Sequence, residues 1–254
     1  MRPKGIVWAA ALAGGLALLP VRGWAQGMPG SGMGWSVGLG VVASPRPYVG
    51  TSTRVTPIPL INYRSRRFSF QGLMLGYRLA GDRRLSLELV ARPSLSGYDP
   101  EDSSFLAGMR PRRWSVDAGV ALSWQGRRLG GRASVVHDVL GRSGGTTASA
   151  GLDLLFRAGA WHLRPGAGLS WESASLVDYY YGVRPSEARP WRPAYRGTST
   201  VDVYGSLLAL RPLWGRWSFF ALARVRVLGS GATDSPIVDR RTDLTGVVAV
   251  NAKL

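Results

Sequence analysis

The sequence contains no cysteine, and only two of its 32 basic residues, Lys4 and Lys253, are lysine. Without cysteine the chain can form no disulfide, thiolate zinc site or cysteine nucleophile. It has only two histidines, which is too few for a histidine-rich metal centre. Acidic residues are also scarce, with 15 Asp and Glu against 32 basic residues, a formal net charge of +17. We therefore expect no metal and no cofactor in a strongly basic protein.

The basic residues, 30 of them arginine, are spread along the chain with no basic helix, zinc finger or RNA-binding signature to organise them. We accordingly expect no nucleic-acid partner. Two interpretations of the charge remain open. One is a solvated, arginine-rich surface. The other is contact with outer-membrane lipid and with lipopolysaccharide, because arginine binds phosphate through two parallel hydrogen bonds.

The first 25 residues have the pattern of a secretory signal peptide. Arg2 and Lys4 precede an uncharged, mainly apolar run over residues 5–20, and Gly23 and Ala25 are the small residues that a signal peptidase reads. We predict a signal peptide over 1–25, a short glycine-rich lead-in over 26–33 and one domain over 34–254. No later apolar run reaches the roughly 20 residues of a spanning helix.

The predicted domain alternates apolar and small or polar residues with a period of two. Residues 113–124 are typical, because one parity carries Trp114, Val116, Ala118, Val120, Leu122 and Trp124. Successive side chains of a strand point to opposite faces, so such a segment has one apolar face. Tryptophans stand ten residues apart at the ends of two such segments, Trp114 with Trp124 and Trp161 with Trp171. That spacing matches a tilted strand that crosses a bilayer with aromatic rings at both interfaces.

These features predict an all-β fold, a transmembrane antiparallel β-barrel in the outer membrane of a Gram-negative bacterium. Eleven strands are expected over residues 34–43, 55–64, 68–79, 84–95, 113–124, 127–138, 146–157, 160–172, 201–213, 216–228 and 244–254. Bacterial barrels have even strand numbers, so within a range of 10–12 we predict twelve, with one strand missed before residue 113. The long connections 96–112, 173–200 and 229–243 are expected outside the cell, and the tight turns in the periplasm.

Several short motifs in this order resemble the MipA/OmpV family of outer-membrane proteins. They are Pro47-Tyr48-Val49-Gly50-Thr51, Pro57-Ile58-Pro59-Leu60-Ile61-Asn62-Tyr63-Arg64, Asp138-Val139-Leu140-Gly141-Arg142-Ser143-Gly144-Gly145, Asp178-Tyr179-Tyr180-Tyr181-Gly182-Val183 and Asp234-Ser235-Pro236-Ile237-Val238. The similarity runs from about Trp35 to the C-terminus. The resemblance implies an outer-membrane barrel. It also implies a scaffold that joins a murein hydrolase, a lytic transglycosylase, to a bifunctional murein synthase, although other members are described as porin-like or adhesin-like.

The motif residues can also be interpreted from their own chemistry, without the resemblance. Pro47, Tyr48 and Gly50 suit a tight turn, and Asp234, Ser235 and Pro236 suit an Asx-type turn before the last strand. The run Tyr179, Tyr180, Tyr181 and Gly182 lies in a long loop, where the rings either pack the loop or form a recognition surface. No Gly-x-Ser-x-Gly elbow or other hydrolase signature is present, so no catalytic residue is assigned and the protein is not expected to be an enzyme.

The parity opposite the apolar face supplies the residues expected to line the barrel. They are Glu88, Arg92, Asp117, Arg132, Asp153, Arg157, Arg164, Glu172, Asp202, Arg224 and Arg226. Such a set can form a plug of interlocked ion pairs or a narrow polar channel that prefers anions. Two functional hypotheses follow. The first is a non-enzymatic scaffold for murein enzymes, and the second is a porin-like channel for small anionic solutes.

Overall fold

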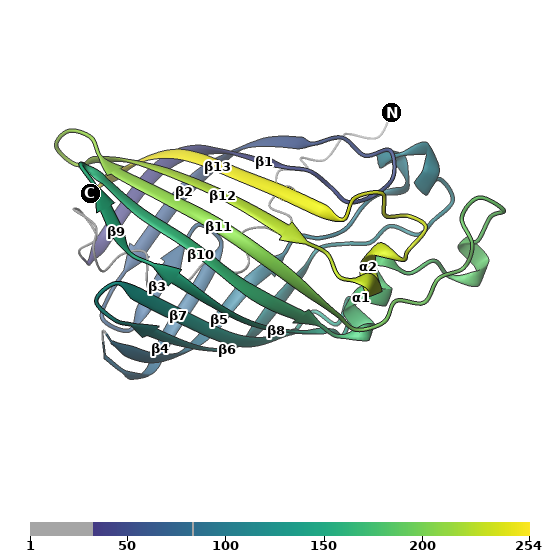
Figure 1. The fold of residues 1–254 in the computed structure, drawn as a ribbon, viewed down its shortest axis with the longest axis horizontal. Helices are drawn as coiled ribbons and strands as arrows, with labels where there is room; N and C mark the ends of the chain where they lie inside the picture. The colour runs from purple at the N-terminus through teal and green to yellow at the C-terminus, as the bar shows by residue number, and fades with distance from the viewer. Residues whose placement is uncertain (1–32, 83) are drawn as a thin grey trace, which may run out of the picture.

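The computed structural model describes residues 33–82 and 84–254, which form one closed β-barrel (Figure 1). The predicted signal peptide lies outside the described residues. The strands are β1 (Gly34–Ser44), β2 (Arg54–Arg64), β3 (Phe68–Gln71), β4 (Met74–Gly81), β5 (Leu85–Ser94), β6 (Ser115–Gln125), β7 (Leu129–Asp138), β8 (Thr146–Leu154), β9 (Phe156–Ala158), β10 (Trp161–Glu172), β11 (Thr200–Pro212), β12 (Trp217–Val227) and β13 (Thr242–Lys253). All their pairings are antiparallel, and the β13–β1 and β10–β11 pairings complete the closure.

The barrel wall has twelve strands, which confirms the predicted number. Segments β8 and β9 pair with β10 in one continuous register, Asp153 with Gly166 and Phe156 with Leu163, so together they make one strand. The prediction of a single strand over 68–79 is wrong. This segment turns back at Gly72, which has a φ of +59°, and forms the β3–β4 hairpin that supplies the missing strand. A positive φ costs glycine little, because glycine has no Cβ.

The short β3 leaves part of one edge of β2 without a strand partner among the described residues. Strand β2 pairs with β1 along its whole length, but with β3 only through Asn62, Tyr63 and Arg64. The amide of Gly72 donates to the carbonyl of Ile61 at 3.2 Å, so the polar groups of that parity point away from β1. Pro57 and Pro59 share that parity, and proline nitrogens carry no hydrogen. The two prolines therefore remove donors from the free edge, a common protection of edge strands.

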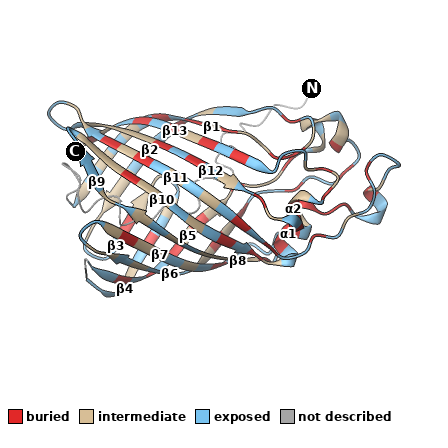
Figure 2. Cartoon of the chain, in the orientation of Figure 1, coloured by how far each residue is buried: buried red, intermediate tan, exposed pale blue. Residues whose placement is uncertain are grey.

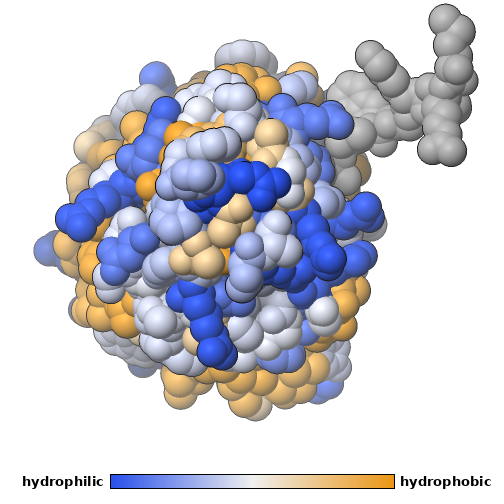
Figure 3. Space-filling view, turned by 90° about the vertical axis from the view of Figure 1, so that its right-hand side faces the viewer, coloured by the Kyte–Doolittle hydropathy of each residue, from blue (hydrophilic) through white to orange (hydrophobic). Residues whose placement is uncertain are grey.

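Buried and exposed residues alternate along the strands (Figure 2), and the outer face is apolar whereas the inner face is mainly polar. On β1, for example, Trp35, Val37, Leu39 and Val41 are exposed outward, whereas Val42 and Ser44 are buried inside. Figure 3 looks onto the end of the barrel that carries the long loops, where hydrophilic residues dominate the centre and hydrophobic residues surround the flank. No helix in the described part of the chain is long and apolar enough to cross a membrane.

The two ends of the barrel differ in length and structure. The connections at one end are short turns, and both termini of the barrel, Gly34 and Lys253, lie at this end. The long connections at the other end contain the helices α1 (Ala174–Tyr181) and α2 (Ser230–Thr233) and three short 3₁₀ turns. Short turns are periplasmic and long loops extracellular in barrels of this kind. We call the folded long loops the outer cap.

Candidate functional site

The barrel interior near the outer cap is organised around Arg226 of β12. Its guanidinium lies 2.9 Å from the carboxylate of Asp243, 3.4 Å from Asp202 and 3.6 Å from Glu172. All three carboxylates are buried, and they come from strands β13, β11 and β10. A cation shared by three buried acids ties four neighbouring strands together across the lumen. Removing the cation would leave uncompensated buried charge.

Three further arginines pair with acids deeper in the barrel or beside this cluster. Arg164 donates from Nε to Asp153 at 2.9 Å, and Arg92 lies 3.7 Å from Asp117. Arg132 lies 3.6 Å from Glu88 and donates to the hydroxyl of Ser123 at 2.7 Å. Each of these pairs joins adjacent strands or strands close together in the wall. Ion pairs between side chains therefore link nearby strands at several levels of the polar lumen.

Arg224 and Arg157 take different positions from these paired arginines. Arg224 is buried and lies over the ring of Tyr204, with 4.0 Å between its guanidinium carbon and the ring centroid. Arg157 shares the inward parity of Asp153 but is exposed at the periplasmic end of β9. Asp243, which the strand pattern assigned to a loop because the last strand was expected to start at residue 244, belongs to the lumen. Arg64, Arg78 and Asp138 share the inward parity as well, so without Arg157 seven arginines and seven carboxylates face the lumen.

An apolar layer lines one side of the lumen beside and below the Arg226 cluster. It consists of Val42, Ile58, Leu208, Leu210, Leu222 and Val247, with Leu60 and Phe220 packed against them. On β12 and β13 these side chains take the inward positions next to charged or polar ones. Leu222 is next to Arg224, and Val247 is next to Thr245. The strands that carry this layer, β1, β2, β11, β12 and β13, are neighbours in the wall, so the layer covers one side of the lumen. This layer was not predicted, because parity alone does not show which inward residues meet.

The outer cap has a hydrophobic core of its own, built from loops that are far apart in sequence. It contains Tyr48, Tyr98, Leu106, Met109, Leu176, Val177, Tyr180, Tyr181, Val183, Leu228, Ala232 and Ile237. The ring centroids of Tyr48 and Tyr98 are 4.8 Å apart in an edge-to-face arrangement, and those of Tyr48 and Tyr181 are 6.0 Å apart. Burial raises the pKa values of Tyr48 and Tyr181 above their ordinary range, so both stay neutral.

The tyrosine motif forms the last turn of α1 rather than an irregular loop. Tyr180 and Tyr181 are 2% and 3% exposed, and Gly182 caps the helix with its amide on the carbonyl of Asp178. Tyr179 is partly buried, and its hydroxyl accepts a hydrogen bond from the amide of Arg113 at 3.1 Å. The arrangement therefore places these rings in loop packing.

The two turn motifs meet each other in the cap. Gly50 has a φ of +73°, and the amide of Thr51 donates to the carbonyl of Tyr48 in the turn that follows Pro47. The amide of Val49 donates to the carbonyl of Ile237 at 2.9 Å. Asp234 ends α2, Pro236 follows, and the buried hydroxyl of Ser235 between them donates to the carbonyl of Tyr181. The three motifs thus converge although nearly 190 residues separate the first from the last.

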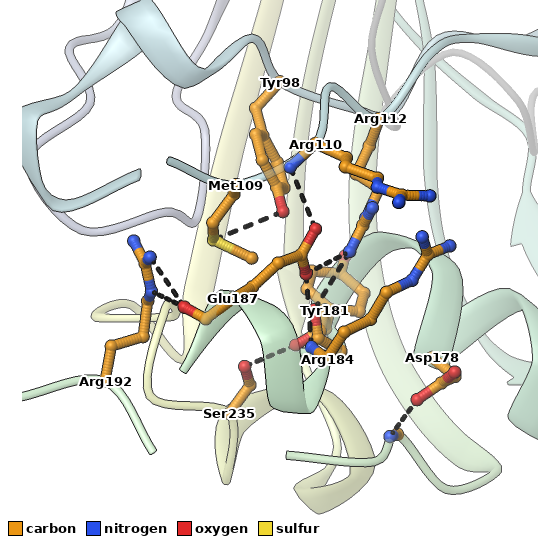
Figure 4. A network of polar contacts seen from close by, with 12 residues as sticks. Tyr98, Met109, Arg110, Arg112, Asp178, Tyr181, Arg184, Glu187, Arg192 and Ser235 are labelled. Atoms are coloured by element: carbon orange, nitrogen blue, oxygen red, sulfur yellow. Dashed lines mark hydrogen bonds and ion pairs between the residues drawn. The ribbon is translucent and has the colours of Figure 1, made fainter. Parts of the chain in front are cut away.

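A buried ion pair inside the cap was not predicted. Glu187 and Arg112 are both almost completely buried and lie 2.9 Å apart (Figure 4). The carboxylate of Glu187 also accepts hydrogen bonds from the amides of Arg110, at 2.9 Å, and Arg184, at 3.2 Å. Burial would raise the pKa of Glu187, but the two amides and the guanidinium of Arg112 outweigh burial, and the pKa is lowered.

Arg192 fastens the same loop to its neighbour. It is 1% exposed and donates to the carbonyls of Glu187, at 2.8 Å, and Ala107, at 3.2 Å, and to that of Phe105. A single side chain therefore satisfies carbonyls from the two longest outer loops. In the sequence, Arg192 stands between Pro190 and Pro193 in the loop 173–200. No local pattern indicates which residues it contacts.

The geometry defines a class of protein. A closed antiparallel barrel with an apolar outer wall, short turns at one end and long loops at the other is a transmembrane β-barrel of the bacterial outer membrane. The family model described as MltA-interacting protein MipA matches residues 37–253. The chain belongs to this family, which confirms the resemblance inferred from the motifs.

Individual relatives agree with this assignment. The chain is 30% identical to the MltA-interacting protein of Escherichia coli K12 over 218 residues, 85% of this chain and 87% of that protein. It is 29% identical to the outer membrane protein OmpV of Vibrio cholerae over 182 residues, 70% of each chain. Among solved structures, the NanC porin matches 85% of this chain at 10% identity with a TM-score of 0.45. A Pseudomonas aeruginosa FadL homologue matches 97% of both chains at 10% identity with a TM-score of 0.41.

Proposed function

We propose that this outer-membrane barrel is a non-enzymatic anchor that holds murein-remodelling and murein-synthesising enzymes at the membrane. The observation that carries the proposal is the packing of side chains at three levels of the interior. The outer cap, the Arg226 cluster and the apolar layer of Val42, Ile58 and Leu222 lie one below another along the lumen. A barrel whose interior is occupied by packed side chains acts through its surfaces.

The name of the Escherichia coli relative, MltA-interacting protein, supports a murein enzyme as the partner. The short periplasmic turns and the barrel rim are the parts of this chain that face the murein layer. The cap faces the other side, so contact with such an enzyme falls to the periplasmic end. An anchor of this kind needs a rigid barrel and no reaction chemistry of its own.

A porin-like channel is the second candidate, and the charged lumen is the observation that favours it. Buried arginines such as Arg164 and Arg224 would attract anions if a path existed. Against it, the inward-facing strand positions carry seven arginines and seven carboxylates that are buried or partly buried, so the excess of arginine expected inside the barrel is gone. The anion preference therefore loses its electrostatic basis.

Two measurements on the refolded protein test the proposal. Single-channel recording should show no stable conductance steps. A pull-down with immobilised barrel should retain a purified lytic transglycosylase. Heat-modifiability on gels shows that the barrel is folded in both assays. Stable steps whose anion preference falls in Arg224→Ala would replace the anchor with a pore, and failure to retain any murein hydrolase or synthase would remove the scaffold role.

A further inference from the structure

Each of the five periplasmic turns between described strands carries exposed arginine. Arg66 and Arg67 lie between β2 and β3, Arg84 between β4 and β5, and Arg127 and Arg128 between β6 and β7. Arg157 lies in β9, beside the turn to β10, and Arg216 lies between β11 and β12. We call these residues, together with Arg211 near the end of β11, the arginine collar. It surrounds the whole periplasmic rim.

The arginine collar has almost no acidic counterpart. In the described part of the chain, its eight arginines share the rim with one exposed acidic side chain, Asp82, and none of the eight makes an ion pair with a described residue. The carboxylate of Asp82 accepts hydrogen bonds from the amides of Arg84 and Leu85 instead. The loops of the outer end also expose eight arginines, but five exposed acids are interspersed among them. Only at the periplasmic end is the exposed charge therefore almost entirely positive.

Arg211 shows which way part of this charge faces. It belongs to the outward parity of β11, opposite Phe219 on β12, and lies beside Trp161 on β10. Its guanidinium carbon lies 5.5 Å from the centroid of the Trp161 ring, and that ring meets Phe219 edge to face at 5.8 Å. An exposed arginine held beside two aromatic rings on the membrane-facing wall cannot reach a protein beneath the barrel. It can reach the headgroup of a lipid in the leaflet beside it.

Aromatic residues mark the depth of the collar in the membrane. Exposed, outward-facing Phe68, Trp124, Phe156 and Trp217 each lie within four residues of a collar arginine. Aromatic belts of barrels sit at the level of the lipid headgroups. Apart from Arg157, which has the inward parity, the collar arginines lie at the level of these belt residues, so their guanidinium groups are placed where the phosphates of the periplasmic leaflet lie.

We propose that the arginine collar binds anionic phospholipids of the periplasmic leaflet through their headgroup phosphates, with Arg211, Trp161 and Phe219 as its most defined site. Guanidinium binds phosphate bidentately, and stacking on Trp161 orients it beforehand. An enzyme docked on one side of the rim would need a local patch. A collar that continues through every turn matches a partner that surrounds the barrel on all sides.

Native mass spectrometry of the whole barrel, released from detergent micelles containing either phosphatidylglycerol or phosphatidylethanolamine, tests the proposal. The wild-type protein should retain phosphatidylglycerol preferentially. Arg211→Gln should weaken that binding about fivefold, the value for one arginine near an anionic surface. Arg211→Lys, which keeps the charge but not the planar stacking, should lie between the two. Substituting Arg66, Arg67, Arg127 and Arg128 together by glutamine should lower the number of lipids retained.

Arg142→Gln is the matched control, because Arg142 is exposed in the β7–β8 loop at the outer end and carries the same charge. It should leave phosphatidylglycerol binding unchanged. All the variants alter exposed side chains, and heat-modifiability shows that each is folded. Equal retention of the two lipids by the wild-type protein, or equal loss in Arg142→Gln and Arg211→Gln, would overturn the proposal. In that case the collar would be left as a surface for an acidic periplasmic protein.

Discussion

The loops at the two ends of the barrel are held in place by different kinds of interaction. At the outer end, loops separated by more than 100 residues pack Tyr48, Tyr181 and Ile237 into a common core and bury the Arg112–Glu187 pair beneath it. At the periplasmic end, each hairpin closes through a few residues with exposed arginine in or beside the turn, and most of the turns include a glycine such as Gly159. The outer end therefore depends on contacts between distant segments, and the periplasmic end on local backbone conformation.

This difference predicts how each end responds to mutation. A change in the cap should open several loops together while the barrel stays folded, because the strands keep their own hydrogen bonds. A change in a periplasmic turn should have a small effect that stays in one hairpin. The surface chemistry follows the same division, since the cap buries Arg112 against Glu187, whereas the turns expose their arginines.

The largest effect is expected from Arg112→Ala. The substitution leaves the carboxylate of Glu187 buried without its cation, and breaking one partner of a buried pair costs about 3–5 kcal/mol. Hydrogen exchange of residues 174–199 should accelerate strongly, while exchange in the strands changes little. Arg142→Ala, an exposed arginine of the neighbouring outer loop, is the control. Unchanged protection of residues 174–199 in Arg112→Ala would show that the pair does not hold the cap.

A smaller effect is expected from acidification. Because the pKa of Glu187 is lowered in the folded cap from its ordinary value of 4.5, its charged form stabilises the cap above that pH. The contribution is lost as the pH falls through the lowered value. Hydrogen exchange of the cap, corrected for intrinsic amide rates and followed from about pH 6 to about pH 3, should show the cap loosening in acid. Glu187→Gln should be looser at neutral pH and lose most of this dependence.

The wall could be predicted from the sequence because its signal is local. The alternation from Trp114 to Trp124 and the even-number rule led to twelve strands, and the outer-membrane location is confirmed. The β3–β4 hairpin was missed because its strands are short and the apolar pattern is marked only by a change of parity, from Phe68 and Phe70 to Leu75, across the turn at Gly72. Gly72 alone is a weak turn signal among 34 glycines.

The interior and the cap could be predicted only in part. Parity indicates which residues point inward, but the sharing of Arg226 by Asp243, Asp202 and Glu172 depends on the register of four strands. The cap core joins Tyr48 to Tyr181 and Ile237, and no period in the sequence links residues so far apart. The burial of the tyrosine motif in that core could therefore be learned only from the three-dimensional structure.

The smallest effect is expected in a periplasmic turn, where it measures the contribution of local backbone conformation alone. Gly159 has a φ of +58°, and no neighbouring atom lies within 4 Å of the position that a Cβ would take, so Gly159→Ala meets backbone strain without a clash. The left-handed conformation costs an alanine about 1 kcal/mol. Gly159→Asn should cost less, because asparagine tolerates this conformation. Urea unfolding in lipid vesicles measures both variants, and cap exchange should stay at the wild-type rate. A loss in Gly159→Ala as large as that in Arg112→Ala, or faster exchange in the cap, would mean that the two ends are coupled through the wall.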